Sequence, residues 1–150
     1  NQPLYRYGNK VEGIRLEFKD GMVVKSSATS NEKLLREMIA TPGANMVGEF
    51  SLTDSRFSRI TQFMAETLYD ENISGSDGNK QGNTHIALGS AYKDCYAGNV
   101  AKLTAAQAHT LGYNDSSVHT DIVSTTRRTV TAHLHDGTTK VIYHNGQFVL

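Results

Sequence analysis

The chain has 150 residues, enough for one domain with a substantial core. Its 15 Lys and Arg balance its 15 Asp and Glu, so the net charge is zero. This balance provides no basic patch for nucleic acid or for an anionic lipid surface. No apolar run approaches the roughly 18 residues that span a bilayer. We therefore expect neither a nucleic-acid nor a membrane partner, and the lone Cys95 is consistent with a cytoplasmic location.

The chain begins Asn1-Gln2-Pro3, without an initiator methionine. We interpret residues 1–150 as one domain of a longer protein. The first predicted element is a hairpin, in which residues 11–18 and 22–24 are strands joined at Asp20-Gly21. An Asp-Gly pair favours a tight turn, because both residues adopt positive φ at low cost.

Helices and one strand are predicted next. Thr29 and Glu32 form the pattern of a capping box, with Thr29 as N-cap of a helix that reaches about Ala40. Pro42 then prevents its continuation. Residues 47–52 are predicted to form a strand, and residues 59–68 carry apolar side chains at helical spacing.

A polar segment with three glycines, residues 75–83, is predicted to be a loop. Thr104 and Gln107 form a second capping box, opening a short helix that Gly112 ends. Two more turns, Asp136-Gly137 and Asn145-Gly146, predict hairpins at the C-terminal end. The expected fold class is α+β, a mixed and mostly antiparallel sheet, barrel-like or strongly curved, with about three flanking helices.

His119 and Asp121 lie two residues apart in the β-branched run 117–123. Side chains at i and i+2 of a strand project from the same face. An imidazole beside a carboxylate is half of a site for a divalent metal. A strand carrying two solvated polar side chains is the simpler alternative.

Glu49, Glu71 and His85 also lie in apolar or ordered surroundings. Together with His119 and Asp121 they supply two imidazoles and three carboxylates, which suit zinc, cobalt or manganese. Such a set could hold two ions about 3.5–4 Å apart. Each residue taken alone also has a structural explanation: an edge strand for Glu49, a helix end for Glu71 and a hydrogen-bonded core imidazole for His85.

The sequence contains no HExxH, no nucleophile elbow, no phosphate-binding glycine loop and no CxxC. Cys95 has no evident base beside it. The other four imidazoles are interpreted as structural or surface groups; they are His109, His133, His135 and His144.

Several short segments resemble the M29 family of metallo-aminopeptidases, the aminopeptidase T and aminopeptidase S group, in a consistent order. They are residues 11–13, 19–21, 48–49, 68–72, 85–89, 91–92 and 114–121. The resemblance implies a C-terminal metal-binding domain that hydrolyses N-terminal residues from peptides and forms a homodimer. It also implies two divalent ions, zinc or cobalt, with manganese and magnesium as alternatives.

The resemblance assigns roles to six residues. It implies that the metal ligands are Glu49, Glu71, His85, His119 and Asp121. Glu49 would also handle a proton, and Tyr92 would stabilise the oxyanion of the tetrahedral intermediate. In that scheme the ions lower the pKa of a bridging water and bind the substrate's amino group. Without the resemblance, Tyr92 would be interpreted as a half-buried aromatic residue.

The chain departs from the family pattern at two places. We expect the chain to lack a further glutamate ligand and an N-terminal α/β domain that the family carries. Fourteen positions separate Glu71 from His85, far more than in the usual pattern. The alternative function is therefore a non-catalytic or incomplete metal-binding module. A third alternative, a carbohydrate- or protein-binding β module, has little support because the chain has no tryptophan.

Overall fold

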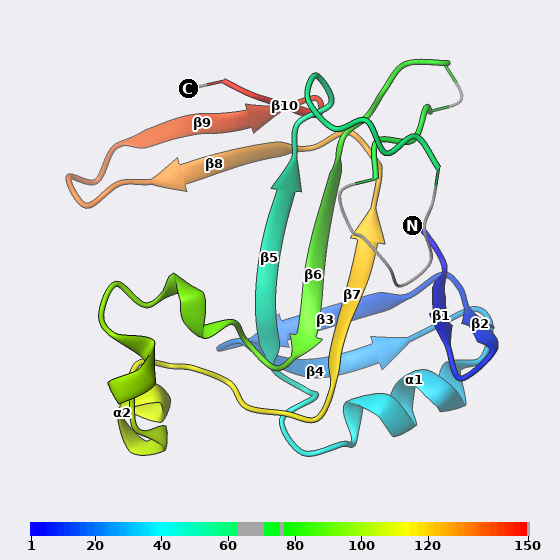
Figure 1. Cartoon of the computed structure of the whole chain (residues 1–150). Helices are drawn as coiled ribbons and strands as arrows, with labels where there is room; N and C mark the ends of the chain where they lie inside the picture. The colour runs from blue at the N-terminus through cyan, green and yellow to red at the C-terminus, as the bar shows by residue number, and fades with distance from the viewer. Residues whose placement is uncertain (63–70, 76, 150) are drawn as a thin grey trace. The chain divides into compact units, whose positions relative to one another are not determined.

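The computed structural model describes residues 1–62, 71–75 and 77–149, and strands dominate these residues (Figure 1). The strands are β1 (Leu4–Arg6), β2 (Asn9–Val11), β3 (Arg15–Lys19), β4 (Met22–Ser27), β5 (Val47–Thr53), β6 (Asn83–Gly89), β7 (His119–Ser124), β8 (Thr129–His133), β9 (Thr139–His144) and β10 (Gln147–Phe148). The helices are α1 (Glu32–Ile39) and α2 (Ala105–Thr110), with 3₁₀ turns η1 (Lys93–Cys95) and η2 (Val100–Lys102).

Contacts along the chain divide it into two units. The first comprises Asn1–Gln2, Ser51–His85 and Val123–Leu150, and the second comprises Pro3–Phe50 and Ile86–Ile122.

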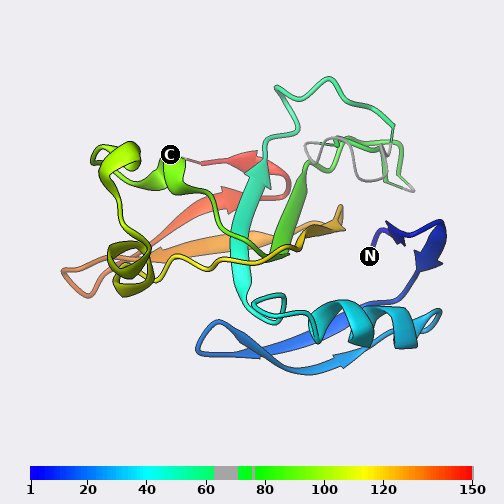
Figure 2. The same cartoon turned by 60° about the horizontal axis from the view of Figure 1, so that its bottom comes forward.

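The second unit contains the two N-terminal hairpins and α1, which packs against β4 and β2. Figure 2 shows α1 running beside the β3–β4 hairpin. Leu35 and Met38 are buried on the inner face of α1, as their spacing predicts. They join a core cluster with Val11, Leu88 and Val118.

The first unit contains the antiparallel meander β8–β9–β10. Tyr143 on β9 is 1 % exposed, and its hydroxyl donates to the carbonyl oxygen of Thr53 at 2.8 Å. Burial raises the pKa of Tyr143 to about 12, so the phenol stays a hydrogen-bond donor.

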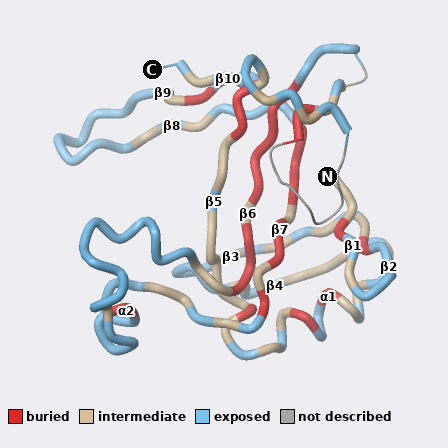
Figure 3. The backbone as a smooth tube through the Cα atoms, in the orientation of Figure 1, coloured by how far each residue is buried: buried red, intermediate tan, exposed pale blue. Residues whose placement is uncertain are grey.

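The sheet that carries the candidate site has the strand order β5–β6–β7. Figure 1 shows β6 running opposite to its two neighbours. Buried residues concentrate on β6 and β7 (Figure 3), and six of the seven residues of β6 are buried. A strand with side chains buried on both faces provides a rigid support for polar groups that must be held apart from water.

The three predicted hairpin turns form, although the first strand of the first hairpin begins at Arg15 and not at Val11. Asp20 and Gly21 have φ of 50° and 78°, and Asn145 and Gly146 have φ of 49° and 83°, as a two-residue turn of this kind requires. A further hairpin, β1–β2, turns through Tyr7 and Gly8 and was not predicted. The signal was weak because a tyrosine occupies the first positive-φ position.

The expectation of an α+β fold, with a barrel-like sheet and about three flanking helices, is wrong. The described residues form four separate sheets of two or three strands, none closed into a barrel, and two α-helices. Most of the helix predicted over 59–68 lies outside the described residues, and residues 59–62 are not helical. Within the same described ranges, neither helix is long and apolar enough to cross a membrane.

The two predicted capping boxes have different outcomes. Thr104 accepts from the backbone of Gln107 and the Gln107 side chain bonds back to Thr104, so this box is confirmed. The box at Thr29 is wrong, because α1 begins at Glu32 with Asn31 as its N-cap. The Thr29 hydroxyl donates instead to the carbonyl oxygen of Glu12, which joins this segment to the preceding chain.

Asp54 should make the stability of the first unit depend on pH. Its buried carboxylate accepts two hydrogen bonds from the Arg56 guanidinium, at 2.7 and 3.0 Å, and one from the Phe148 amide. Chiefly through Arg56, these bonds lower its pKa from 3.8 to about 2. The depressed pKa adds stability above about pH 4, and that stability is lost as the pH falls toward 2.

We expect Asp54→Asn to lower the free energy of unfolding by about 1–2 kcal/mol at pH 7. The loss should shrink between pH 4 and 2, in urea unfolding followed by circular dichroism. A double-mutant cycle of Asp54→Asn with Arg56→Ala separates the contribution of the Arg56 guanidinium from that of the Phe148 hydrogen bond. A loss that stays constant down to pH 2 contradicts this account.

Candidate metal centre

β7 places His119 and Asp121 on one face, as the two-residue spacing predicts. His119 Nε2 lies 3.5 Å from Asp121 Oδ1 and 3.3 Å from Glu49 Oε2. The Asp121 side chain is 1 % exposed, whereas those of His119 and Glu49 are 24 % and 28 % exposed. One imidazole therefore lies beside a buried carboxylate and a more accessible one.

A backbone hydrogen bond sets the tautomer of His119. Its Nδ1 lies 2.6 Å from the carbonyl oxygen of Ser90. A carbonyl oxygen can only accept, so Nδ1 carries the proton and donates. In the neutral imidazole, Nε2 then presents its lone pair toward Glu49 and Asp121. Metal-binding histidines typically donate the N–H of their other ring nitrogen to a carbonyl or carboxylate in this way.

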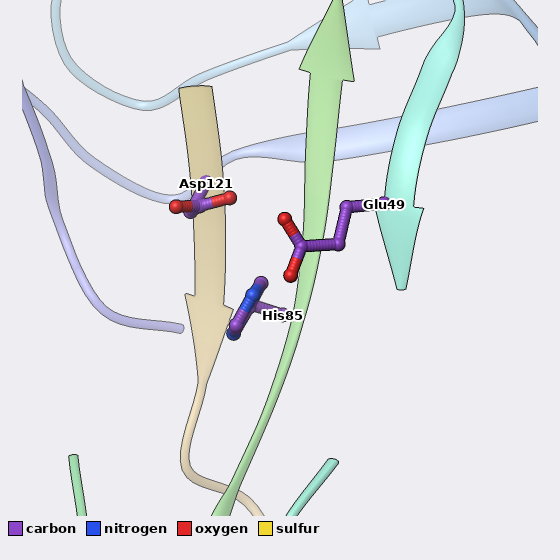
Figure 4. Close-up of side chains that lie close together, drawn as sticks. All are labelled: Glu49, His85 and Asp121. Carbon is purple, nitrogen blue, oxygen red and sulfur yellow. The ribbon is translucent and has the colours of Figure 1, made fainter. Parts of the chain in front are cut away.

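His85 on β6 joins the two carboxylates. One ligand atom each from Glu49, His85 and Asp121 lie within 4.8 Å of one another. Figure 4 shows the three side chains pointing toward one another from three neighbouring strands. His85 and Asp121 are buried and Glu49 is partly buried. Among the described residues this is the group of side chains suited to a metal ion.

Glu71 is not part of that group, although the structure holds it near β6. Glu71 is fully buried, and its carbonyl oxygen accepts from Asn83 Nδ2 at 2.8 Å. Asn83 and His85 are two residues apart on β6, so their side chains leave the strand on the same face. The backbone of Glu71 consequently lies on the face from which His85 projects.

The polar loop predicted at residues 75–83 closes on itself. Ser74 and Lys80 form an antiparallel bridge, and the Gly75 amide donates to the Asn79 carbonyl oxygen. Lys80 Nζ also donates to the carbonyl oxygen of Asn72. The longer spacing between Glu71 and His85 is thus taken up by a loop whose ends, Ser74 and Lys80, are paired with each other.

Tyr92 lies beside His119, with ring centroids 4.9 Å apart. Partial burial is the largest cause that raises the pKa of Tyr92, and the nearby carboxylates of Glu49 and Asp121 raise it further. The phenol is therefore neutral at physiological pH and available as a hydrogen-bond donor. Slightly more than half of the residue is exposed.

The turn at Gly89 and Ser90 was not predicted to have any role. Gly89 has φ of 102°, and Ser90 supplies the carbonyl that orients His119. Asn114 Nδ2 donates to the carbonyl oxygens of Gly89 and Gly43. The glycine following a buried apolar strand was the available signal, because such a position often marks a close approach of two backbones.

Comparison with known proteins identifies the family. Residues 1–148 match the family described as thermophilic metalloprotease (M29). The chain belongs to this family. Membership of a metalloprotease family implies divalent metal ions as cofactors. The imidazole and carboxylate donors on β5, β6 and β7 agree with this.

Several M29 relatives are named aminopeptidases. The chain is 33 % identical to aminopeptidase PepS of Streptococcus thermophilus over 99 % of its length, and 32 % identical to aminopeptidase 2 of Geobacillus stearothermophilus over 98 %. Wild-type AmpT from Thermus thermophilus has a similar structure, with a TM-score of 0.72, 27 % identity and 100 % of this chain covered. The chain spans about a third of the length of these relatives: 35 %, 34 % and 35 %.

Replacing Gly89 should disturb the turn that orients His119. A Cβ at Gly89 would overlap the carbonyl oxygen of Val118, and the positive φ adds strain. We expect Gly89→Ala to reduce the free energy of unfolding by about 3 kcal/mol or more. Gly137→Ala is the matched control, because Gly137 has φ of 81° with open space around its Cβ position.

For the control we expect a loss of about 1 kcal/mol. Urea unfolding of both variants measures the difference. Equal losses would mean that the close approach to Val118 contributes nothing.

Proposed function

We propose that this chain is the metal-binding part of an M29 aminopeptidase, which removes N-terminal residues from peptides. The convergence of Glu49, His85 and Asp121, with His119 alongside, is the observation that carries the proposal. The names of the relatives add support.

The donor set suits a divalent ion of borderline softness. Imidazole nitrogen and carboxylate oxygen are combined without a thiolate, which favours zinc or cobalt and leaves manganese and magnesium as alternatives. When bound, such an ion supplies a water molecule of lowered pKa. The proposed ligands are Glu49, Glu71, His85, His119 and Asp121.

Each group at the site has a role that its surroundings support. Asp121, almost without solvent contact, can supply a carboxylate oxygen to the ion. Glu49 is more accessible and can pass a proton between water and the leaving amine, as a general base and then a general acid. The neutral Tyr92 phenol can donate a hydrogen bond to a developing oxyanion.

Two ions per site are part of the proposal, and Glu71 is the residue on which the second ion most depends. Its position on the His85 face of β6 supports a role as ligand. Glu71 nevertheless lies outside the group that Glu49, His85 and Asp121 form. We therefore propose that the isolated chain holds one ion more tightly than the other. Homodimer formation and a cytoplasmic location stay predictions.

Metal binding tests the site directly. We expect the isolated chain to bind about one Zn²⁺ or Co²⁺ tightly in calorimetric titration. His119→Ala and Asp121→Ala should each weaken binding by at least about tenfold, because each removes a ligand. His109→Ala on the exposed face of α2 is the matched control and should bind as the unchanged chain does. Equal affinity of all four proteins would exclude the proposed centre.

A peptidase assay tests whether these 150 residues are active on their own. We expect little or no turnover of an aminoacyl-anilide or a dipeptide by the isolated 150-residue chain, with or without zinc or cobalt, because these residues span only about a third of the related aminopeptidases. Metal-dependent turnover by this chain would refute that expectation. If the chain binds metal but the full-length protein turns nothing over, the alternative of a non-catalytic metal-binding module replaces the proposal; if the chain binds no metal, the proposed centre fails.

A further inference from the structure

Residues 91–113 form a pocket of about 320 Å³ in the second unit. The pocket lies among η1, η2 and α2, which gather in one region of that unit in Figure 1. Aromatic and aliphatic side chains make most of its wall; they include Tyr92, Tyr96, Leu103, Leu111 and Tyr113.

A hydrogen bond joins the two ends of this segment, and one end directly follows a residue that contacts His119. The Ala91 amide donates to the Asn114 carbonyl oxygen at 2.9 Å, which closes the segment. The residue before Ala91 is Ser90, whose carbonyl oxygen accepts from His119. Ala91, which lines the pocket, thus directly follows the residue that orients a proposed ligand.

Tyr92 belongs to both places. Its ring lines the pocket and lies 4.9 Å from the ring of His119. In an aminopeptidase the N-terminal residue of the substrate lies at the metal, and its side chain branches one bond away from the amino group. A side chain held at His119 would therefore reach a pocket whose wall is Tyr92.

We propose that this pocket receives the side chain of the substrate's N-terminal residue and selects apolar side chains, aliphatic or aromatic. The inference rests on the proposed function. Leu111 and Tyr92 are specificity-determining residues in this scheme, and each is more than half exposed before substrate binds. Covering such surface with an apolar side chain is favourable.

Lys93 sets a limit on the side chains that fit. It is the charged residue of the pocket wall, and its ammonium group lies 4.9 Å from the centre of the Tyr113 ring. A second cation entering the pocket would be repelled and would compete for the same ring. Basic side chains should therefore gain nothing from the pocket.

Amino-acid hydroxamates separate the pocket from the metal centre, because the chelating group stays constant while the side chain changes. We expect the zinc-loaded chain to bind L-leucine and L-phenylalanine hydroxamates about tenfold or more tightly than glycine hydroxamate in calorimetric titration. L-lysine hydroxamate should bind no better than glycine hydroxamate.

Two variants and a control test the wall. The measured quantity is the affinity for phenylalanine hydroxamate relative to glycine hydroxamate. Leu111→Ala should reduce this ratio about threefold or more. Ala97→Leu, which fills the pocket, should reduce the ratio to a similar extent. Val100→Ala should leave it unchanged, because Val100 is an exposed apolar residue of the same segment outside the pocket wall.

Equal affinity for the glycine, leucine and phenylalanine compounds would overturn the pocket and leave the metal centre intact. A gain that Leu111→Ala and Ala97→Leu leave unchanged would also overturn it. If none of the four hydroxamates binds zinc-loaded protein, the proposed metal centre fails and this inference fails with it.

Discussion

The close approach of backbones at the end of β6 is the constraint on which the candidate centre depends. Gly89 adopts a φ of 102°, and a side chain there would overlap Val118. The Ser90 amide donates to the Val118 carbonyl oxygen, and the Ser90 carbonyl accepts from His119. His119, the first residue of β7, is thereby held in two ways. Its imidazole donates to Ser90, and the carbonyl of the preceding Val118 accepts from Ser90. Asn114 bonds the Gly89 carbonyl and so attaches the pocket segment to the same turn.

Local features of the fold could be predicted where a turn or cap is specified by adjacent residues. Asp20-Gly21 and the Thr104–Gln107 box act within a few positions, and both form as expected. Thr29 shows the limit of such reasoning. Its pattern with Glu32 is that of a cap, but the carbonyl of Glu12, seventeen positions away, takes its hydroxyl. A tertiary partner replaced the local one, and the sequence contains no sign of that competition.

The candidate centre was predictable to a similar extent. The strand period places His119 and Asp121 on one face, and this follows from two residues of sequence. Their approach to Glu49 depends on strand order, which no local pattern specifies. The family resemblance implied that Glu49 belongs to the same site as His119 and Asp121, and no pattern in the sequence alone did so. The Ser90 bond lay beyond both kinds of reasoning, because any residue has a carbonyl and only the folded backbone shows which one faces an imidazole.

Electrostatics connects the stability of this region to its proposed ion. Glu49 and Asp121 place two carboxylates around His119 in a small and largely buried volume. Like charges at such separations disfavour each other, and burial increases the cost. A divalent cation there would reverse the sign of the interaction, so binding free energy would contribute to the stability of the fold. The carboxylates of Glu49 and Asp121 repel each other when no ion is bound. The buried strand β6 and the hydrogen bond from His119 to Ser90 oppose that repulsion, because they hold the donor groups in place.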